Sequence, residues 1–146
     1  FQSYNLLPNL TATENVAMPL LFRGVPRRDR EEAARALLKR VGLSHRLDHF
    51  PRQMSGGQQQ RAGIARAFIA RPDVVFADEP TGNLDSKTTV EIMEMICTFA
   101  RNYHQTIILV THDPEMASYA DRIVTLIDGE IVSNQRNQKE NPRHET

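Results

Sequence analysis

The sequence has little of several features that would place it in a special class of protein. It contains a single cysteine, Cys97, which excludes an internal disulfide and suits a reducing compartment. No run of about 18 apolar residues occurs, so no segment is expected to cross a membrane, and no signal peptide is visible. Lysine plus arginine and aspartate plus glutamate both total 18, which leaves no net charge. A basic nucleic-acid-binding surface is therefore not expected.

The remaining composition is that of a globular domain, with 40% hydrophobic and 25% charged residues in a chain of 146. Cys97 is expected to be a small core residue on a helix, because no Cys/His cluster surrounds it. His45 and His49 are spaced as metal ligands on one helix face would be, but no third ligand accompanies them. We expect both histidines to lie in a surface loop.

Two helices are predicted in the first 42 residues. Thr11 and Glu14 have the spacing of a capping box at the start of the first helix. Asp29 is predicted to cap the second helix, and Gly42 to follow its last turn. The apolar stripe of the second helix is predicted at Ala33, Ala36, Leu37 and Val41.

A third helix is predicted to start at Ser55, which forms another capping box with Gln58 and is followed by two glycines. Pro72 is expected to end this segment. Its apolar face is predicted at Ile64, Ala67 and Phe68. No convincing strand occurs between residues 9 and 72, which indicates a helical subdomain.

The second half of the chain alternates strands and helices, which predicts an α/β layer with a parallel sheet. The predicted elements are a strand at 74–77 that is buried on both faces, a helix at 86–101, a strand at 106–110, a short helix near Pro114, and a hairpin of 123–127 and 130–132. The inward positions of the long helix are predicted at Val90, Met93, Ile96, Cys97 and Ala100. Residues 73–132 thus form the α/β part, and 133–146 are expected to be a flexible polar tail.

Charged side chains follow both buried strands. Asp78 and Glu79 come after the first, and His112 and Asp113 come after the second. Because ligands bind at the carboxyl ends of parallel strands, two carboxylates and an imidazole are expected to converge there. Carboxylates there suit Mg²⁺ and a base that polarises water.

A second candidate site is the start of the third helix. The glycines after Ser55 leave backbone N–H groups open at a positive helix end, which is suited to an anion.

These motifs together resemble the ATP-binding domain of ABC transporters over nearly all of the chain. Gln2 is similar to the Q-loop of that family. Residues 54–58 resemble its signature motif, with methionine where leucine is usual, and 74–79 resemble Walker B with the catalytic glutamate. Residues 83–85 match the D-loop, and His112 matches the switch histidine. The runs 1–8 and 78–86 look most like the group that serves lipoprotein release and macrolide or antimicrobial-peptide export.

The resemblance implies an α/β fold of the P-loop NTPase type that binds ATP and Mg²⁺. It implies that Gln2 senses Mg²⁺ and the attacking water, and that Asp78 holds Mg²⁺ through water. Glu79 is implied as the general base, and His112 as a contact of the γ-phosphate.

The resemblance also implies two partners at the cytoplasmic face of a membrane. One is a second ATP-binding subunit, whose ATP would be contacted by Ser55, Gly56, Gly57 and Gln58, with Asp85 at the interface. The other is a transmembrane permease subunit, which residues 4–30 would face. A nucleic-acid partner is not implied.

The pattern departs from the family at one point, because none of the seven glycines is followed by lysine and no G-x-x-x-x-G-K-[ST] occurs. The first residue is Phe1, and we expect the front strands and the phosphate-binding loop to lie ahead of it. On that expectation the isolated chain is inactive. Two alternatives stay open: an ABC-type ATPase of DNA repair or translation, and a fragment that acts only in trans with an intact homologue.

Overall fold

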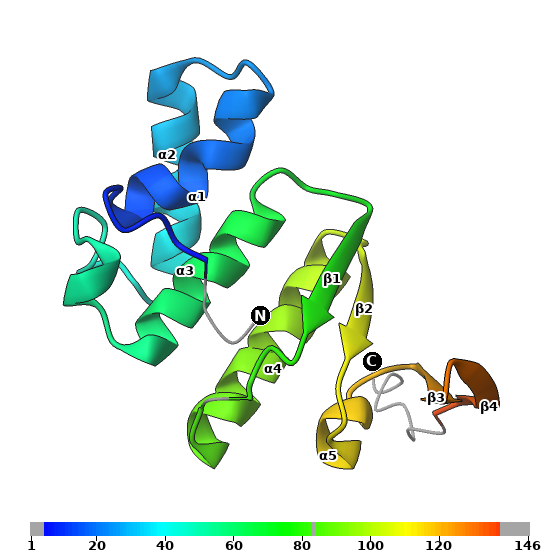
Figure 1. Ribbon diagram of the computed structural model, residues 1–146. Coiled ribbons are helices and arrows are strands. Elements are labelled where there is room, and N and C mark those ends of the chain that lie inside the picture. The colour runs from blue at the N-terminus through cyan, green and yellow to red at the C-terminus, as the bar shows by residue number, and fades with distance from the viewer. Residues whose placement is uncertain (1–4, 83, 138–146) are drawn as a thin grey trace, which may run out of the picture.

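The chain folds into a helical part followed by an α/β part, as the computed structural model shows in Figure 1 for residues 5–82 and 84–137. The helical part consists of α1 (Ala12–Phe22), α2 (Arg27–Arg40), the short 3₁₀ helix η1 (Pro51–Gln53) and α3 (Gly56–Phe68). The α/β part consists of β1 (Val74–Asp78), α4 (Ser86–Asn102), β2 (Thr106–Val110), α5 (Pro114–Ala117), β3 (Arg122–Ile127) and β4 (Glu130–Arg136). The described stretch of the chain has no helix that is both long and apolar enough to span a bilayer.

The two predicted capping boxes are confirmed. The Thr11 amide donates to Glu14 Oε2 at 2.8 Å, and the Glu14 amide donates to Thr11 Oγ1 at 3.2 Å. At the start of α3 the Ser55 amide donates to Gln58 Oε1 at 3.0 Å, and the Gln58 amide donates back to Ser55 Oγ at 3.3 Å. Each box satisfies two backbone donors that the first helical turn leaves without an intrahelical partner.

The start and the inner face of α2 differ from the prediction. Pro26 is the N-cap, and Asp29 lies in the first turn without capping the helix. Ala36 is exposed, and the buried positions are Ala34, Leu37, Leu38 and Val41. The helix packs against α1 as well as α3, so its buried face is rotated from the single stripe expected from apolar spacing. Gly42 has φ +79° and follows the last turn as predicted.

The inner face of α3 also differs in part. Ile64 and Phe68 are buried as predicted, but Ala67 is exposed, and Ala62 and Ala65 are buried instead. Alanine fits both a core and a surface, so apolar spacing alone places it poorly.

In α4, Met93 and Ile96 are buried as predicted, together with Ile92 and Phe99, and Cys97 is partly buried. Val90 is 37% exposed, which contradicts its predicted inward position.

Strands β1 and β2 pair in parallel, with Val74 opposite Thr106 and Asp78 opposite Val110. One face of this pair, including Val75 and Ile107, packs on the helical core. The other face is open: its exposed side chains are Val74 (41%), Phe76 (74%), Ile108 (41%) and Val110 (54%). The predictions that strand 74–77 is buried on both faces and that strand 106–110 is a second buried strand are therefore wrong for the described residues, because a second layer does not cover the outer face.

The predicted hairpin is confirmed, and its turn is formed by Asp128 (φ +49°) and Gly129 (φ +82°). Strand β4 continues to Arg136, which pairs with Arg122. Residues 133–136, expected to belong to a flexible tail, instead pair with β3, and residues 138–146 lie outside the described part of the chain. The hairpin projects to one side of the molecule in Figure 1.

The two candidate metal-binding histidines lie on a non-helical segment, as expected, and the His49 carbonyl accepts the Ala12 amide at 2.8 Å. Within 5–82 and 84–137, no cluster of three or more His, Cys, Asp or Glu residues is suited to a metal ion.

Candidate functional site

Glu79 is the residue at which the chain leaves the parallel sheet. Its amide donates to the Val110 carbonyl at 2.9 Å, which extends the strand pairing by one residue. Its backbone then adopts φ +42°, a left-handed conformation that is uncommon for a residue other than glycine. The Gly82 amide donates to the Glu79 carbonyl at 3.3 Å and closes the turn that follows. This turn directs the chain away from β1 while the Glu79 side chain stays beside the end of β2.

The Glu79 carboxylate is held by two residues that follow β2. Oε1 accepts the His112 amide at 2.9 Å and lies 2.6 Å from His112 Nδ1, and Oε2 accepts the Thr111 hydroxyl at 3.2 Å. The predicted convergence of Glu79 and His112 is therefore confirmed. Asp113 does not join them, because its carboxylate accepts the Glu115 amide at 2.8 Å and caps α5.

These contacts also favour the ionised form of the Glu79 carboxylate. The hydrogen bond from the His112 side chain is the main cause that lowers the pKa of Glu79, and the Thr111 hydroxyl lowers it further. Because an ionised carboxylate only accepts, His112 Nδ1 is the donor in its contact with Glu79 Oε1. The imidazole is 89% exposed, so its Nε2 side is open to a ligand.

Asp78 lies one residue earlier, at the last position of β1, where it pairs with Val110 on the open face of the sheet. A cavity of about 180 Å³ between β1 and α3 is lined in part by Asp78, Gln60 and Pro80. Carboxylate oxygens are hard donors, and Mg²⁺ bound with a phosphate needs just one or two of them. The Asp78 carboxylate is thus a donor of the kind that suits Mg²⁺ in the presence of a phosphate ligand, whereas both Glu79 oxygens already accept hydrogen bonds.

The start of α3 forms the second part of the candidate site. Ser55 and Gly56 are exposed at the positive end of a 13-residue helix, where the Gln58 amide is capped by the Ser55 hydroxyl. Gly57 has no left-handed backbone, and a Cβ added there would lie 3.4 Å from Thr88 Cγ2, an ordinary contact. Neither conformation nor packing within the chain therefore requires glycine at this position.

The start of α4 lies beside the start of α3, because Thr88 in the first turn of α4 is the nearest neighbour of Gly57. Asp85 is the N-cap of α4, and its Oδ1 accepts the Thr88 amide at 3.0 Å while Oδ2 accepts the Thr88 hydroxyl at 2.6 Å. These two hydrogen bonds lower the pKa of Asp85. The structure thus brings Asp85 together with the glycine-rich helix start.

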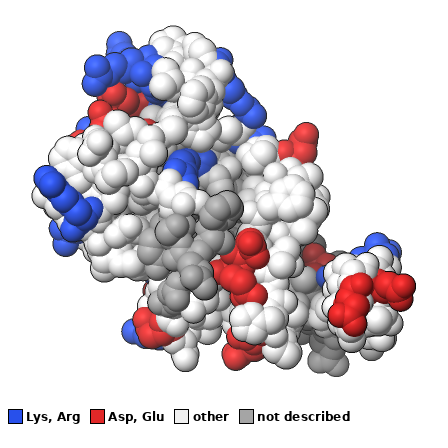
Figure 2. All heavy atoms as spheres, viewed as in Figure 1, with Lys and Arg blue, Asp and Glu red and all other residues white. Residues whose placement is uncertain are grey.

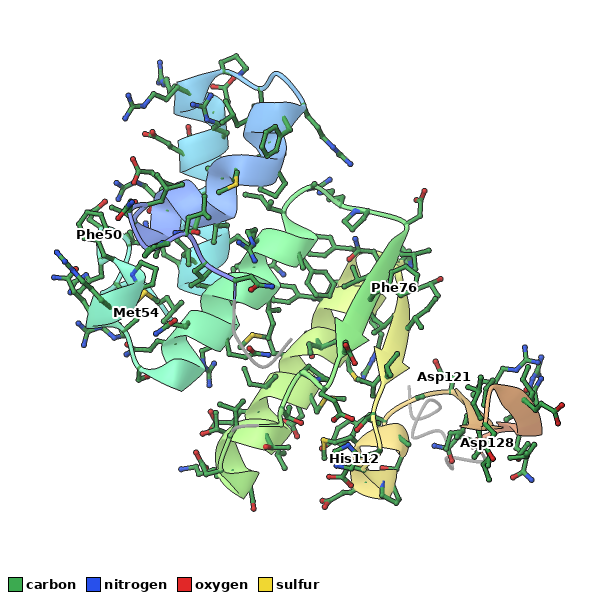
Figure 3. The ribbon with its side chains drawn as sticks, in the orientation of Figure 1. Phe50, Met54, Phe76, His112, Asp121 and Asp128 are labelled. Atoms are coloured by element: carbon green, nitrogen blue, oxygen red, sulfur yellow. The ribbon has the colours of Figure 1, made fainter. Side chains whose placement is uncertain are left out.

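The signature segment and the Glu79–His112 pair lie on different sides of the molecule. Figure 3 places Met54, which precedes Ser55, in the helical part and His112 at the far end of β2. In the view of Figure 2, most of the visible lysine and arginine side chains lie over the helical part, and acidic side chains lie near the lower ends of the strands. Met54 and His112 thus lie on different elements and apart from each other in this view.

Gln2 and Asn83, which the sequence places in the site, lie outside the described residues. Sequence reasoning missed Thr111 and Gln60. Thr111 could have been suspected, because it lies between the end of strand 106–110 and His112 and carries a hydroxyl that can donate to a carboxylate. Gln60 gave no signal beyond its place in a run of three glutamines.

The parallel strands, the flanking helices and the acidic pair at the strand ends define an α/β protein of the P-loop NTPase type. Comparison with protein families matches residues 1–82 to the family described as "ABC transporter". The chain belongs to this family.

Several characterised or solved proteins are similar to the chain. The lipoprotein-releasing system ATP-binding protein LolD of Geobacter metallireducens is 51% identical over 91% of this chain and 59% of its own length. The macrolide export ATP-binding/permease protein MacB of Chlorobium luteolum is 49% identical over 95% of this chain and 21% of its own length. The dimeric structure of the ATP-binding cassette MJ0796 bound to ADP and Pi has a TM-score of 0.82 at 40% identity, and the match covers 95% of this chain and 62% of that one. The chain thus spans about three fifths of LolD.

Proposed function

We propose that this chain is the part of an ABC transporter ATP-binding subunit that carries the signature motif and the catalytic glutamate. In that subunit, ATP hydrolysis drives transport through a membrane partner. The observation that carries the proposal is the Glu79 carboxylate, held ionised by His112 and Thr111 at the carboxyl ends of two parallel strands. An oriented carboxylate of this kind suits a base that accepts a proton from an attacking water.

In the proposed site, Glu79 accepts the proton of the water, and His112 holds the carboxylate through Nδ1 while its exposed edge faces the γ-phosphate. Asp78 and Gln2 hold Mg²⁺, which supplies charge neutralisation on the phosphates when it is bound. The hydrogen bonds at Glu79 limit the rotation of its side chain, so the base is oriented before substrate binds.

The signature residues Ser55, Gly56, Gly57 and Gln58 are proposed to bind the γ-phosphate of ATP on a second ATP-binding subunit, with Asp85 at the interface. The exposed start of α3, with a glycine at position 57 that the fold of this chain does not require, supports this assignment. Further support comes from the similar MJ0796 cassette, whose solved structure is a dimer.

The second proposed partner is a transmembrane permease subunit, which places the chain at the cytoplasmic face of the membrane. Residues 4–30 are the proposed contact region. Phe22 is 82% exposed and Leu21 48% exposed at the end of α1, and exposed apolar side chains of this kind favour a protein contact.

A mixed dimer tests the proposed role of Ser55. LolD in which the signature serine is replaced by arginine should hydrolyse no ATP alone, and addition of this chain should restore turnover by supplying an intact signature. The variant Ser55→Arg should abolish the restoration. The matched variant Ser44→Arg changes an exposed serine outside the motif and should leave it intact. Absence of restoration, or restoration that survives Ser55→Arg, would contradict the proposal.

A chimera tests the proposed role of Glu79. The Walker A-bearing segment of LolD is joined to this chain, so that Glu79 faces a complete phosphate site. Glu79→Gln should lower turnover by about 10²–10⁴-fold, the range for loss of a general base, while ATP binding persists. Glu130→Gln, an exposed site on β4, is the control. Equal turnover of the two variants would exclude Glu79 as the base.

A further inference from the structure

Three consecutive glutamines follow the signature glycines, and their side chains have different partners. Gln58 Oε1 accepts the Ser55 amide at 3.0 Å, and Gln59 Nε2 donates to the Met54 carbonyl at 3.1 Å. Both contacts stay within the start of α3. Gln60 instead donates from Nε2 to the Pro80 carbonyl, 20 residues further along the chain.

Pro80 directly follows Glu79 in the turn that leaves β1. The Gly82 amide donates to the Glu79 carbonyl at 3.3 Å, and the Leu84 amide donates to the Thr81 carbonyl at 3.1 Å. Thr81 is 9% exposed, so the middle of this turn is buried. The turn therefore connects Glu79 at one end with the cap of α4 at the other, and Gln60 is bonded to it from the signature helix.

Gln60 also lies close to Asp78, because both residues line the same cavity together with Pro80. Its bond to Pro80 is part-buried, so water competes for it less than at the surface. The neighbouring Arg61 anchors the same helix to α4 through Glu91, with Nη2 and Oε2 2.5 Å apart. The Arg61 pair ties the signature helix to the side of α4, whereas Gln60 ties it to the turn after the base.

We propose that Gln60 is a positioning residue that couples the signature helix to the turn carrying Glu79. The proposal rests on the proposed function, because it assigns a role to Gln60 in presenting Ser55 and Gly57 to a second subunit. Through this bond, a displacement of the turn is passed to the helix start, so the site served by the signature and the chain's own Glu79 move together. The bond does not contact ATP, and Gln60 is therefore not a catalytic residue.

The chain offers a closely matched control. Gln105 Nε2 donates to the Pro72 carbonyl at 2.5 Å, which is the same glutamine-to-proline bond at the opposite end of β1. Gln60→Glu and Gln105→Glu each replace a donor amide by a carboxylate of equal size that repels the carbonyl. The two variants should lose similar stability. Any difference between them in hydrogen exchange or in restored turnover therefore arises from where the lost bond lies in the fold. Gln60→Lys keeps a donor and should retain most of the wild-type behaviour.

The first measurement uses amide hydrogen exchange on the full chain. Gln60→Glu should raise the exchange rates of the Gly82 and Leu84 amides and of the first amides of α3 about fivefold, the factor expected for loss of one neutral hydrogen bond. Gln105→Glu should leave those amides unchanged. Unchanged exchange at Gly82 and Leu84 in Gln60→Glu overturns the coupling, whatever the enzymatic result.

The second measurement uses the mixed dimer with signature-disabled LolD. Gln60→Glu should lower restored turnover at saturating ATP by about tenfold, as misplaced groups do, with little change in KM because the partner holds the nucleotide. Gln105→Glu should restore turnover as the wild type does. If the wild-type chain restores nothing, the proposed function fails while hydrogen exchange still decides the coupling. If Gln60→Glu restores fully, the positioning role is wrong and the proposed function stands.

Discussion

His112 Nδ1 lies 2.6 Å from Glu79 Oε1, so residues 33 positions apart in sequence form one hydrogen-bonded pair at the ends of β1 and β2. The pair depends on two features of the backbone. The parallel register brings both strands to an end at the same edge, and the left-handed backbone of Glu79 keeps its carboxylate beside β2.

Loss of the imidazole should change the titration of Glu79. His112→Ala removes the largest cause of the lowered pKa, so the pKa of Glu79 should rise toward its ordinary value. Thr111→Val should raise it less. Carboxyl NMR titration of the full chain measures both shifts, and His45→Ala, on an exposed histidine away from the pair, is the control. An unchanged Glu79 titration in His112→Ala would show that the pair does not form in solution.

Gly57→Ala should separate folding from function. The added Cβ meets Thr88 Cγ2 at 3.4 Å with no left-handed backbone, and alanine favours a helix, so stability should be unchanged or rise by up to about 1 kcal/mol. Restored turnover in the mixed dimer should nevertheless fall about tenfold or more, because the methyl group blocks close approach of a phosphate.

Gly24→Ala provides the converse of this substitution. Gly24 has φ +74° with no atom within 4 Å of an added Cβ, so alanine there should cost about 1 kcal/mol through backbone strain alone. Its restored turnover should remain that of the wild type. Chemical denaturation measures both stabilities, and a Gly57→Ala variant that loses stability as Gly24→Ala does would exclude a functional reason for the glycine.

The capping box of α1 should make stability depend on pH. Hydrogen bonds from the Thr11 amide and hydroxyl lower the pKa of Glu14 from 4.5. The folded pKa is below the unfolded value, so this stabilisation is complete above about pH 4.5 and is lost as the pH falls through the folded pKa.

Glu14→Gln keeps the acceptor but cannot titrate, so the difference in unfolding free energy between wild type and variant should shrink as the pH falls below 4.5. Because Glu14 is partly exposed to solvent, which screens its interactions, the effect should be a fraction of 1 kcal/mol. Glu31→Gln, in an exposed i,i+4 pair with Arg27, is the comparison. A difference that does not vary with pH would show that the Glu14 carboxylate is not held in solution.

The open face of β1 should promote self-association. Phe76 is 74% exposed among other apolar side chains of the same sheet face, and the outer edge of β1 is unpaired in the described residues. Phe76→Thr should lower the concentration-dependent association seen by analytical ultracentrifugation. Phe22→Thr, at a similarly exposed phenylalanine on a helix, should lower it less. Equal effects of the two substitutions would show that the sheet face is not the contact.

Local chemistry explains which parts of the fold were predictable. The boxes at Thr11 and Ser55 and the turn at Gly129 use residues that satisfy neighbouring backbone groups, so a few adjacent positions suffice. The inner faces of α2 and α3 were less well predicted, because the packing partners of a helix decide which of its alanines is covered. The convergence of Glu79 and His112 was predictable from strand order, but Thr111 and Gln60 were not, since their partners depend on how separate elements pack.

The sequence by itself determined the order of helices and strands, the two capped helix starts and the presence of the family motifs, because each depends on residues close together in the chain. The tertiary structure alone decided which carboxylate at the strand ends accepts hydrogen bonds from the residues after β2, and which residues donate them. It assigned Glu79 to His112 and Thr111, and it used Asp113 as a helix cap. It also joined Gln60 of α3 to Pro80 in the turn after β1. These relations arise from the register of the parallel strands and the packing of α3 and α4, which bring together residues that the sequence keeps apart.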